Sequence, residues 1–432
     1  MLPFRSDTVS DAYAARATRF LHGYFTGHPG ALRFALETED ASRHKMLAAV
    51  NEKGDALSAM NALAKRLDPA ARAFSTTNPE ATSAWGRGEF ERAVGIDPGF
   101  GAAWLGWIDQ LASHGSTADA IGVAHRALAQ PSLRSPVDRA RIEVAAAALA
   151  GNVPARNQAL AKLAGLTPND IVVLEQLAEG ESNARNFTAA AGAWRKASEL
   201  DPENGAALNS LGYAEAEAGN LDASRAAFEA YGRMPGQKTN SLDSLGEAYF
   251  INGRFAEAEK YFLAAQQSDP SFLAGADLFK AAYAHWLGGD LKGADAVFTR
   301  YLDLRRNDPL RPWREAVWLY STGRREAAIA RLQSAPANPI SQRQLAVWNA
   351  KIAVDEAALR QKYERTPPTS DGQARVFYAE ALVAAGKMAE ARPLLTRWPL
   401  PDEHGGDPLL ESLLFPKFLE LRKQAGLAGS AR

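Results

Sequence analysis

Cysteine is absent from this chain of 432 residues, so disulfides, thiolate metal sites and thiol nucleophiles are all excluded. Long apolar runs are also missing. The first ten residues, MLPFRSDTVS, lack the apolar core of a secretory signal peptide. No window approaches the roughly 18 consecutive apolar residues of a membrane span. We therefore expect a cytoplasmic protein if Met1 is the native start, although a removed leader would leave no trace here.

A surplus of one charge is lacking as well. Lysine and arginine together number 49 against 50 acidic residues, which gives a formal net charge of -1. This balance disfavours a direct nucleic-acid partner or an anionic membrane surface. The hydrophobic content of 46% is ample for a core. Because the chain is too long for one ordinary compact domain, its length predicts two or three domains or one elongated repeat array.

Motifs for chemistry are absent too. The sequence contains no phosphate loop, no H-E-x-x-H zinc pair, no G-x-S-x-G elbow and no EF-hand loop. Its 7 histidines are scattered, and no two are three or four residues apart. Carboxylate pairs such as Glu215 and Glu217 are typical of solvated helix faces. We predict no catalytic residue, no metal site and no cofactor.

What the sequence does contain is a repeat. Residues 242–270 read LDSLGEAYFINGRFAEAEKYFLAAQQSDP, which predicts two short helices joined at Asn252-Gly253. The spacing matches W-x2-L-G-x2-Y in a first helix, A-x3-F in a second helix, and then proline. The matching residues are Leu242, Leu245, Gly246, Tyr249, Ala258, Phe262 and Pro270. The segment therefore resembles the tetratricopeptide repeat family.

The same register recurs along the chain. The aromatic place of the second helix is occupied, at steps of 34 or 36 residues, by Phe90, Ala124, Leu160, Trp194, Phe228, Phe262, Phe298 and Leu332. A turn glycine recurs independently at Gly115, Gly151, Gly219, Gly253, Gly289 and Gly323, with Arg185 as the exception. Glycine suits this place because it adopts the left-handed conformation that ends a helix. A small residue at the eighth place of the repeat, which lies in the first helix, lets the paired helices approach closely.

These features predict an all-α fold, a right-handed α-solenoid of antiparallel helix pairs. We assign the array to residues 81–335. Residues 336–432 are predicted to hold degenerate pairs, including helices near 344–353 and 355–363, a loop at 399–408 and a capping helix. Residues 1–80 show helical patterns at 10–25 and 41–67, and 68–85 is predicted as a loop. This N-terminal part is expected to be a helical cap, a pair of divergent repeats or the remnant of another domain.

The resemblance also implies a binding surface. In this family the first helix of each pair lines a concave groove, chiefly through its second, fifth, ninth, twelfth and thirteenth places. The candidate partner-binding residues are then Glu175, Glu179, Asn209, Tyr213, Asn240, Asp243, Glu247, Phe250, Phe279, Tyr283, Trp286, Trp313 and Tyr320. Acids and aromatics at these places favour a protein or peptide segment that carries basic residues beside apolar anchors.

Two competing interpretations stay open for these residues. Aromatic side chains at helical spacing can be packing residues, and Asp243 and Glu247 can belong to a solvated face. At the level of the protein, we expect a non-catalytic scaffold for protein or peptide binding. The alternatives are a sensor module of a larger bacterial signalling or transcriptional regulator and, less favoured, a small enzyme domain within residues 1–80. Homo-oligomers are also compatible with the sequence.

Overall fold

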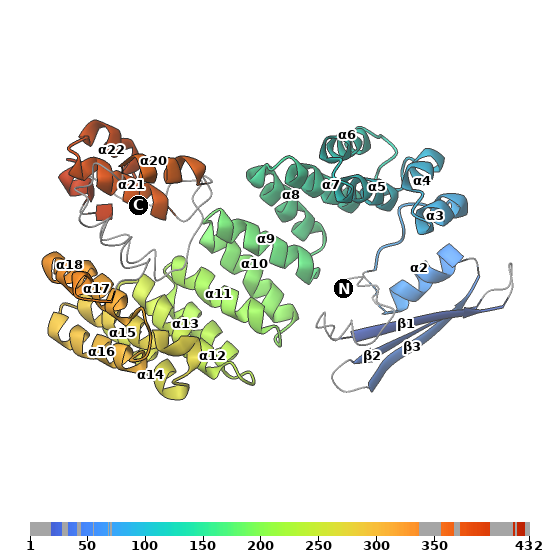
Figure 1. The fold of residues 1–432 in the computed structure, drawn as a ribbon. Coiled ribbons are helices and arrows are strands. Elements are labelled where there is room, and N and C mark those ends of the chain that lie inside the picture. The colour runs from blue at the N-terminus through green and yellow to red at the C-terminus, as the bar shows by residue number, and fades with distance from the viewer. Residues whose placement is uncertain are drawn as a thin grey trace. The chain divides into compact units, whose positions relative to one another are not determined.

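The computed structural model describes residues 19–27, 33–40, 45–54, 56–67, 69, 71–336, 356–366, 372–397, 418–419 and 421–427. The chain divides into two compact units, Met1–Gln176 and Leu177–Arg432. Helices dominate both units (Figure 1). Among the helices of the described part, none is long and apolar enough to cross a membrane.

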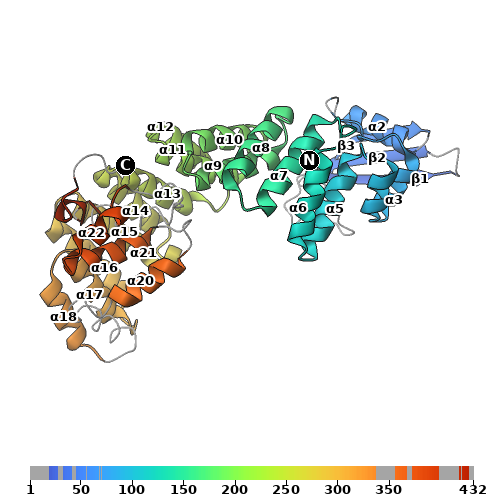
Figure 2. The same cartoon turned by 90° about the horizontal axis from the view of Figure 1, so that it is seen from above.

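The first unit begins with a β-sheet rather than with the expected helices. Strands β1 (Arg19–Thr26), β2 (Arg33–Asp40) and β3 (Lys45–Lys53) form an antiparallel sheet in the order β1-β2-β3. Helix α2 (Ala56–Leu67) packs on β3 and β2, and Arg66 forms an ion pair of 2.8 Å with Glu52 (Figures 1 and 2). The helical prediction was therefore wrong for 19–25 and 45–53 and correct for 56–67.

The sequence explains this error. The segment β2 reads RFALETED, and its Leu36 and Thr38, two residues apart, are both buried. A proline and a glycine at 29–30 separate β1 from β2, which is a turn signal. The apolar residues of a short segment such as β1 fit the period of a helix as well as that of a strand. Pairing with the neighbouring strand decides which of the two structures forms.

Helix pairs follow the sheet in the first unit. They are α3 (Pro79–Gly86), α4 (Phe90–Ile96), α5 (Gly101–Ser113), α6 (Thr117–Leu128), α7 (Pro136–Leu149) and α8 (Val153–Leu166). The predicted loop at 68–85 is correct for 71–78 and wrong for 79–85, where helix α3 forms. This helix begins because the Asn78 side chain accepts hydrogen bonds from two first-turn amides and Pro79 suits the first helical position.

The second unit continues the array. Its helices are α9 (Ile171–Asn183, within which the unit boundary falls), α10 (Phe187–Leu200), α11 (Gly205–Glu217), α12 (Leu221–Gly232), α13 (Lys238–Ile251), α14 (Phe255–Ser268), α15 (Ala276–Leu287), α16 (Leu291–Leu304), α17 (Arg311–Ser321) and α18 (Arg325–Gln333). From α10 to α18, each helix packs against the next one. The prediction of an α-solenoid is confirmed for the repeats.

The turn residues behave as the repeat requires. The predicted turn glycines have positive φ angles, for example 71° at Gly253 and 82° at Gly219, and Arg185 takes the same conformation at 59°. A contact between the paired helices explains why the residue at the eighth place of the repeat is small. A Cβ atom added to Gly246 would lie 2.5 Å from the Phe262 ring. Close approach of α13 and α14 therefore depends on this glycine.

One connection departs from the regular pattern. Between α14 and α15 the chain forms the short helix η1 (Phe272–Gly275), in which Leu273 and Ala274 have φ angles of 45° and 53°. Left-handed backbone at residues other than glycine costs free energy. The connection contains the two extra residues of the 36-residue step from Phe262 to Phe298.

Near the C-terminus lie α20 (Glu356–Arg365), α21 (Gln373–Ala384) and α22 (Met388–Leu394), and residues 418–419 and 421–424, within the predicted capping helix, are also helical. Helix α20 overlaps the predicted helix at 355–363, and α21 and α22 form a helix pair within the part predicted to hold degenerate pairs. Phe418 and Leu421 pack with them in one apolar cluster. The predicted helix at 344–353 and the predicted loop at 399–408 lie outside the described residues.

Candidate functional site

The candidate residues of the middle repeats meet in a buried polar cluster. It is formed by the first helices of three consecutive pairs, α11, α13 and α15. Lys280 of α15 lies at its centre and forms ion pairs with two carboxylates of α13, at 2.7 Å from Asp243 and at closer range from Glu247. Asp243, Glu247 and Lys280 are only 4%, 6% and 7% exposed. Neither carboxylate therefore belongs to a solvated face.

Helix α11 extends this cluster. The Tyr213 hydroxyl lies 2.6 Å from Glu247 and 3.1 Å from the Ser244 hydroxyl. Ser244 in turn donates to the side-chain oxygen of Asn209 at 3.2 Å. Four candidate residues, Asn209, Tyr213, Asp243 and Glu247, are thus joined to one another by polar contacts within the protein.

Burial and charge act against each other in this cluster. Burial raises the pKa of Glu247, and nearby Asp243 adds to the rise while Lys280 opposes it. Burial alone lowers the pKa of Lys280, but the carboxylates of Glu247 and Asp243 outweigh burial and raise it. The pKa of Tyr213 is raised by burial and by Glu247. Lys280 therefore stays charged and Tyr213 stays neutral at ordinary pH.

The aromatic candidates on α13 and α15 mostly pack inside the protein. Phe250 is 1% exposed and contacts Phe255 and Phe262. Tyr283 is also buried, with its ring centroid 5.1 Å from that of Trp318. Phe279 and Trp286 are half-buried at the edge of the same apolar cluster. Phe250 and Tyr283 therefore present almost no surface to a ligand in this conformation.

The remaining candidates are more open. Glu179 on α9 is exposed, and Glu175 is half-buried. Asn240 is half-buried and donates to the Tyr231 hydroxyl at 2.9 Å. Trp313 and Tyr320 of α17 are half-buried against the apolar residues of α18. These candidates keep more exposed surface than Asp243, Glu247, Phe250 and Tyr283.

Sequence reasoning missed three residues of this region. Lys280 and Asp277 complete the buried cluster, and Trp318 stacks on Phe298 while donating to Asp295 at 2.7 Å. Lys280 stands at the sixth place of its repeat, equivalent to Ser244 one repeat earlier, and only helix packing shows that it pairs with Asp243 and Glu247. The interpretation of Glu215 as part of a solvated face was wrong, since Glu215 is 1% exposed and pairs with Arg195.

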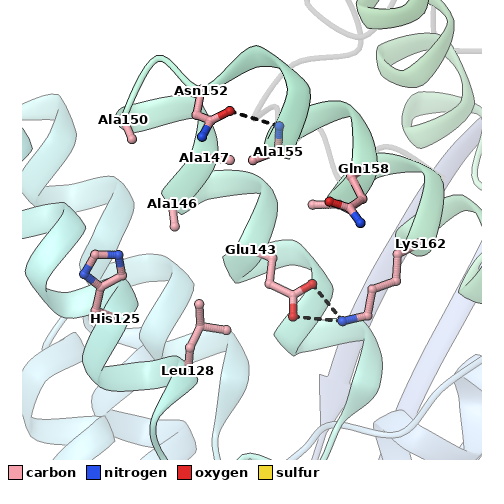
Figure 3. A pocket seen from close by; sticks show the side chains of 11 residues that line it. His125, Leu128, Glu143, Ala146, Ala147, Ala150, Asn152, Ala155, Gln158 and Lys162 are labelled. Carbon is pink, nitrogen blue, oxygen red and sulfur yellow. Dashed lines mark hydrogen bonds and ion pairs between the residues drawn. The ribbon is translucent and has the colours of Figure 1, made fainter.

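A pocket of about 570 Å³ lies in the first unit between α6, α7 and α8 (Figure 3). Its floor is lined mainly by alanines. Lys162 bridges to both carboxylate oxygens of Glu143, at 2.7 and 2.8 Å, while His125 lies on the opposite side (Figure 3). Asn152 uses its side chain to cap α8. The pocket offers a small apolar surface with an internally neutralised ion pair.

A more polar hollow of about 790 Å³ lies in the second unit, between α10, α12 and α14. Three arginines line it, and each has an acidic partner: Arg195 with Glu215, Arg225 with Asp222, and Arg254 with Glu257. Because the charges are compensated within the protein, the hollow is not an anion site. Among the described residues, no group of three or more acidic or histidine side chains is arranged to hold a metal.

Comparison with known families agrees with the helix pairs of the second unit. Residues 176–237 and 244–271 match the family model of the tetratricopeptide repeat. The chain contains tetratricopeptide repeats. The matched residues run from α9 to the end of α14, which are the helices that carry the regular period. Proteins of this family are generally non-catalytic scaffolds for protein interaction. None of the curated proteins matches the chain.

Several solved structures are similar to this chain. A tetratricopeptide repeat protein from Parabacteroides merdae is 12% identical, with 57% of this chain and 97% of that chain covered and a TM-score of 0.39. PilF of Pseudomonas aeruginosa is 15% identical, covering 50% and 94%, with a TM-score of 0.31. Yeast Tom70 is 12% identical, covering 80% and 88%, with a TM-score of 0.38. At these values the likenesses carry no functional argument.

Proposed function

We propose that this protein is a non-catalytic scaffold that binds a protein or peptide through the first helices of its repeats. The family match over residues 176–237 and 244–271 carries the proposal, because stacked repeats of this kind present extended surfaces for binding. The partner segment is proposed to be basic and apolar. Glu179 is exposed on α9, and half-buried aromatic side chains lie on α15 and α17.

The burial pattern narrows the proposed contact residues. Asp243, Glu247, Phe250 and Tyr283 are held inside the protein, so contact with a partner falls to the open candidates. These are Glu175, Glu179, Asn209, Asn240, Phe279, Trp286, Trp313 and Tyr320, with Tyr213 half-buried at the edge of the cluster. An acidic residue beside aromatic surface suits lysine or arginine next to apolar anchors.

Charge reversal tests the proposal. Proteins captured from the native extract are purified, and their affinity for the intact chain is measured by calorimetry. We expect Glu179→Lys to weaken binding by about tenfold or more, because like charges oppose a basic partner. Glu199→Lys is the matched control, since Glu199 is exposed on the second helix α10. Equal binding by both variants and the intact chain would mean that this surface is not the one used.

A further inference from the structure

The buried cluster contains more acid than base. Asp277, at the start of α15 and three residues before Lys280, interacts electrostatically with Asp243, Glu247 and Lys280, so that three carboxyl groups share this region with a single ammonium. Lys280 makes its two ion pairs with Asp243 and Glu247, and Asp277 takes part in neither of them. A buried carboxylate without a donor or a countercharge is costly.

Asp277 has no surface exposed to solvent. Neither of its carboxyl oxygens has a hydrogen-bond donor. Buried polar groups are nearly always hydrogen bonded, so an orphan of this kind requires an explanation. A protonated Asp277 explains the missing donor, because the carboxylic acid can itself donate its proton in a hydrogen bond to Asp243. Burial and this shared hydrogen bond raise the pKa of Asp277 to about 8.

On α13, Asp243 and Glu247 face Asp277, and Lys280 faces it from its own helix. Tyr213 reaches the cluster from α11 through Glu247.

The charged groups of the other elements packed against α15 have other partners or face solvent. The charged groups of α14 have partners outside this cluster. Glu257 pairs with Arg254, Glu259 pairs with His285, and Lys260 lies over the ring of Tyr261. On α16, Asp295 pairs with Arg324, Asp303 pairs with Arg311, and Lys292 and Arg300 are exposed, while Arg305 after α16 donates to the Ala274 carbonyl and pairs with Asp308.

The chain immediately before Asp277 is conformationally strained. Leu273 and Ala274 both have left-handed φ angles, and Gly275 follows at 77°. This backbone persists only while the packing of α15 holds it in place. A weaker contact between α13 and α15 would therefore also release strain in the connection that precedes α15.

We propose that Asp277 and Asp243 form a buried proton-binding site between α13 and α15, and that loss of the shared proton loosens the packing of these helices. The proposal does not depend on what the protein binds. Since Glu247 of this cluster is hydrogen bonded to Tyr213, which lies at the edge of the proposed contact surface, the proton would further tie partner binding to pH, and this last step rests on the proposed function.

The proton itself can be observed by infrared difference spectroscopy of the intact chain and of Asp277→Asn. We expect a protonated-carboxyl band at pH 6 that disappears by pH 9.5 and is absent from the variant at both pH values. Asp222→Asn is the control, because the Asp222 side chain is 97% exposed. A spectrum of Asp277→Asn identical to that of the intact chain would overturn the proton site.

Stability gives a second readout. Because the native protein keeps a proton that the unfolded chain releases above about pH 4, this group stabilises at low pH, and its contribution is lost as pH rises through about 8. Between pH 6 and 8, the unfolding constant of the intact chain should rise about tenfold per pH unit relative to Asp277→Asn. Parallel profiles would contradict the proposal.

Hydrogen exchange, corrected for the intrinsic pH dependence of the rate, tests the loosening step. We expect α13 and α15 of the intact chain to lose protection between pH 6 and 9, and those of Asp277→Asn to keep it. If the infrared band behaves as expected but protection does not change, the loosening step is wrong. If both hold and partner affinity is independent of pH, the proton site stands and the link to the proposed surface fails.

Discussion

Lys280 explains why Asp243 and Glu247 are neither solvent-facing nor obvious ligand contacts. The repeat pattern leaves both acids unconstrained, since they fall between the packing positions of the first helix. Their partner lies on the next first helix along the chain, 2.7 Å from Asp243. A sequence pattern confined to one repeat cannot reveal such a pairing, because only the stacking of α13 against α15 brings the charges together.

Removal of the central ammonium should be strongly destabilising. Lys280→Met leaves two buried carboxylates without a countercharge, and we expect a loss of about 3–5 kcal/mol in the free energy of unfolding. Lys162→Met is the matched control, because the pair of Lys162 with Glu143 is 50% and 31% exposed and should contribute at most about 1 kcal/mol. Urea unfolding at pH 7 measures both. Similar losses for the two variants would show that the buried cluster is not specially stabilising.

His285 should make stability depend on pH in the neutral range. Its ring lies 2.7 Å from Glu259 and 3.0 Å from Asp290, and hydrogen bonds to Asp290 and then to Glu259 raise its pKa. The ion pairs of protonated His285 stabilise the folded protein fully below the pKa of histidine in the unfolded chain, about 6.5. This stabilisation is lost as pH rises through the higher pKa of His285 in the folded protein.

The titration of His285 can be followed by nuclear magnetic resonance, together with urea midpoints from pH 5 to 9. We expect His285→Gln to flatten the profile in the window above about 6.5. A folded pKa for His285 at or below the unfolded value would contradict the expectation.

At the scale of helices and strands, local signals predicted most of what the structure shows. Turn glycines, helix caps and the small eighth position act within one helix pair, so their spacing is visible in the sequence. The strands β1 and β3 were missed because the apolar pattern of a segment of eight or nine residues fits both the helical and the strand period. Pairing with β2, which no local pattern of β1 or β3 encodes, determines their structure.

A pair of glycine substitutions separates close packing from helix propensity. Gly246→Ala places a methyl group against the Phe262 ring and should cost about 1–3 kcal/mol in the free energy of unfolding. Gly192→Ala, in α10, meets no atom within 4 Å and should stabilise by about 0.5–1 kcal/mol. Thermal unfolding of the two variants beside the intact chain measures the difference. Stabilisation by both would show that α13 and α14 do not need the small residue.

At the scale of the whole molecule, contacts between neighbouring elements predominate, as in other repeat arrays. Stability in such an array is approximately a sum of repeat and interface contributions. Hydrogen exchange followed by mass spectrometry should therefore show that Lys280→Met reduces protection in α11–α16 and leaves α5–α7 of the first unit unchanged. An equal loss of protection in both units would indicate that they unfold as one body.

The irregular connection between α14 and α15 also bears on how repeats of this kind are detected. The second family match ends at residue 271, and η1 begins at Phe272. The two extra residues shift α15 and α16 against the 34-residue period of the preceding repeats, although these two helices pack against each other as α13 and α14 do. The spacing from Gly289 to Phe298 equals that from Gly253 to Phe262, so the insertion changes the step between repeats and leaves the helix pair itself unchanged.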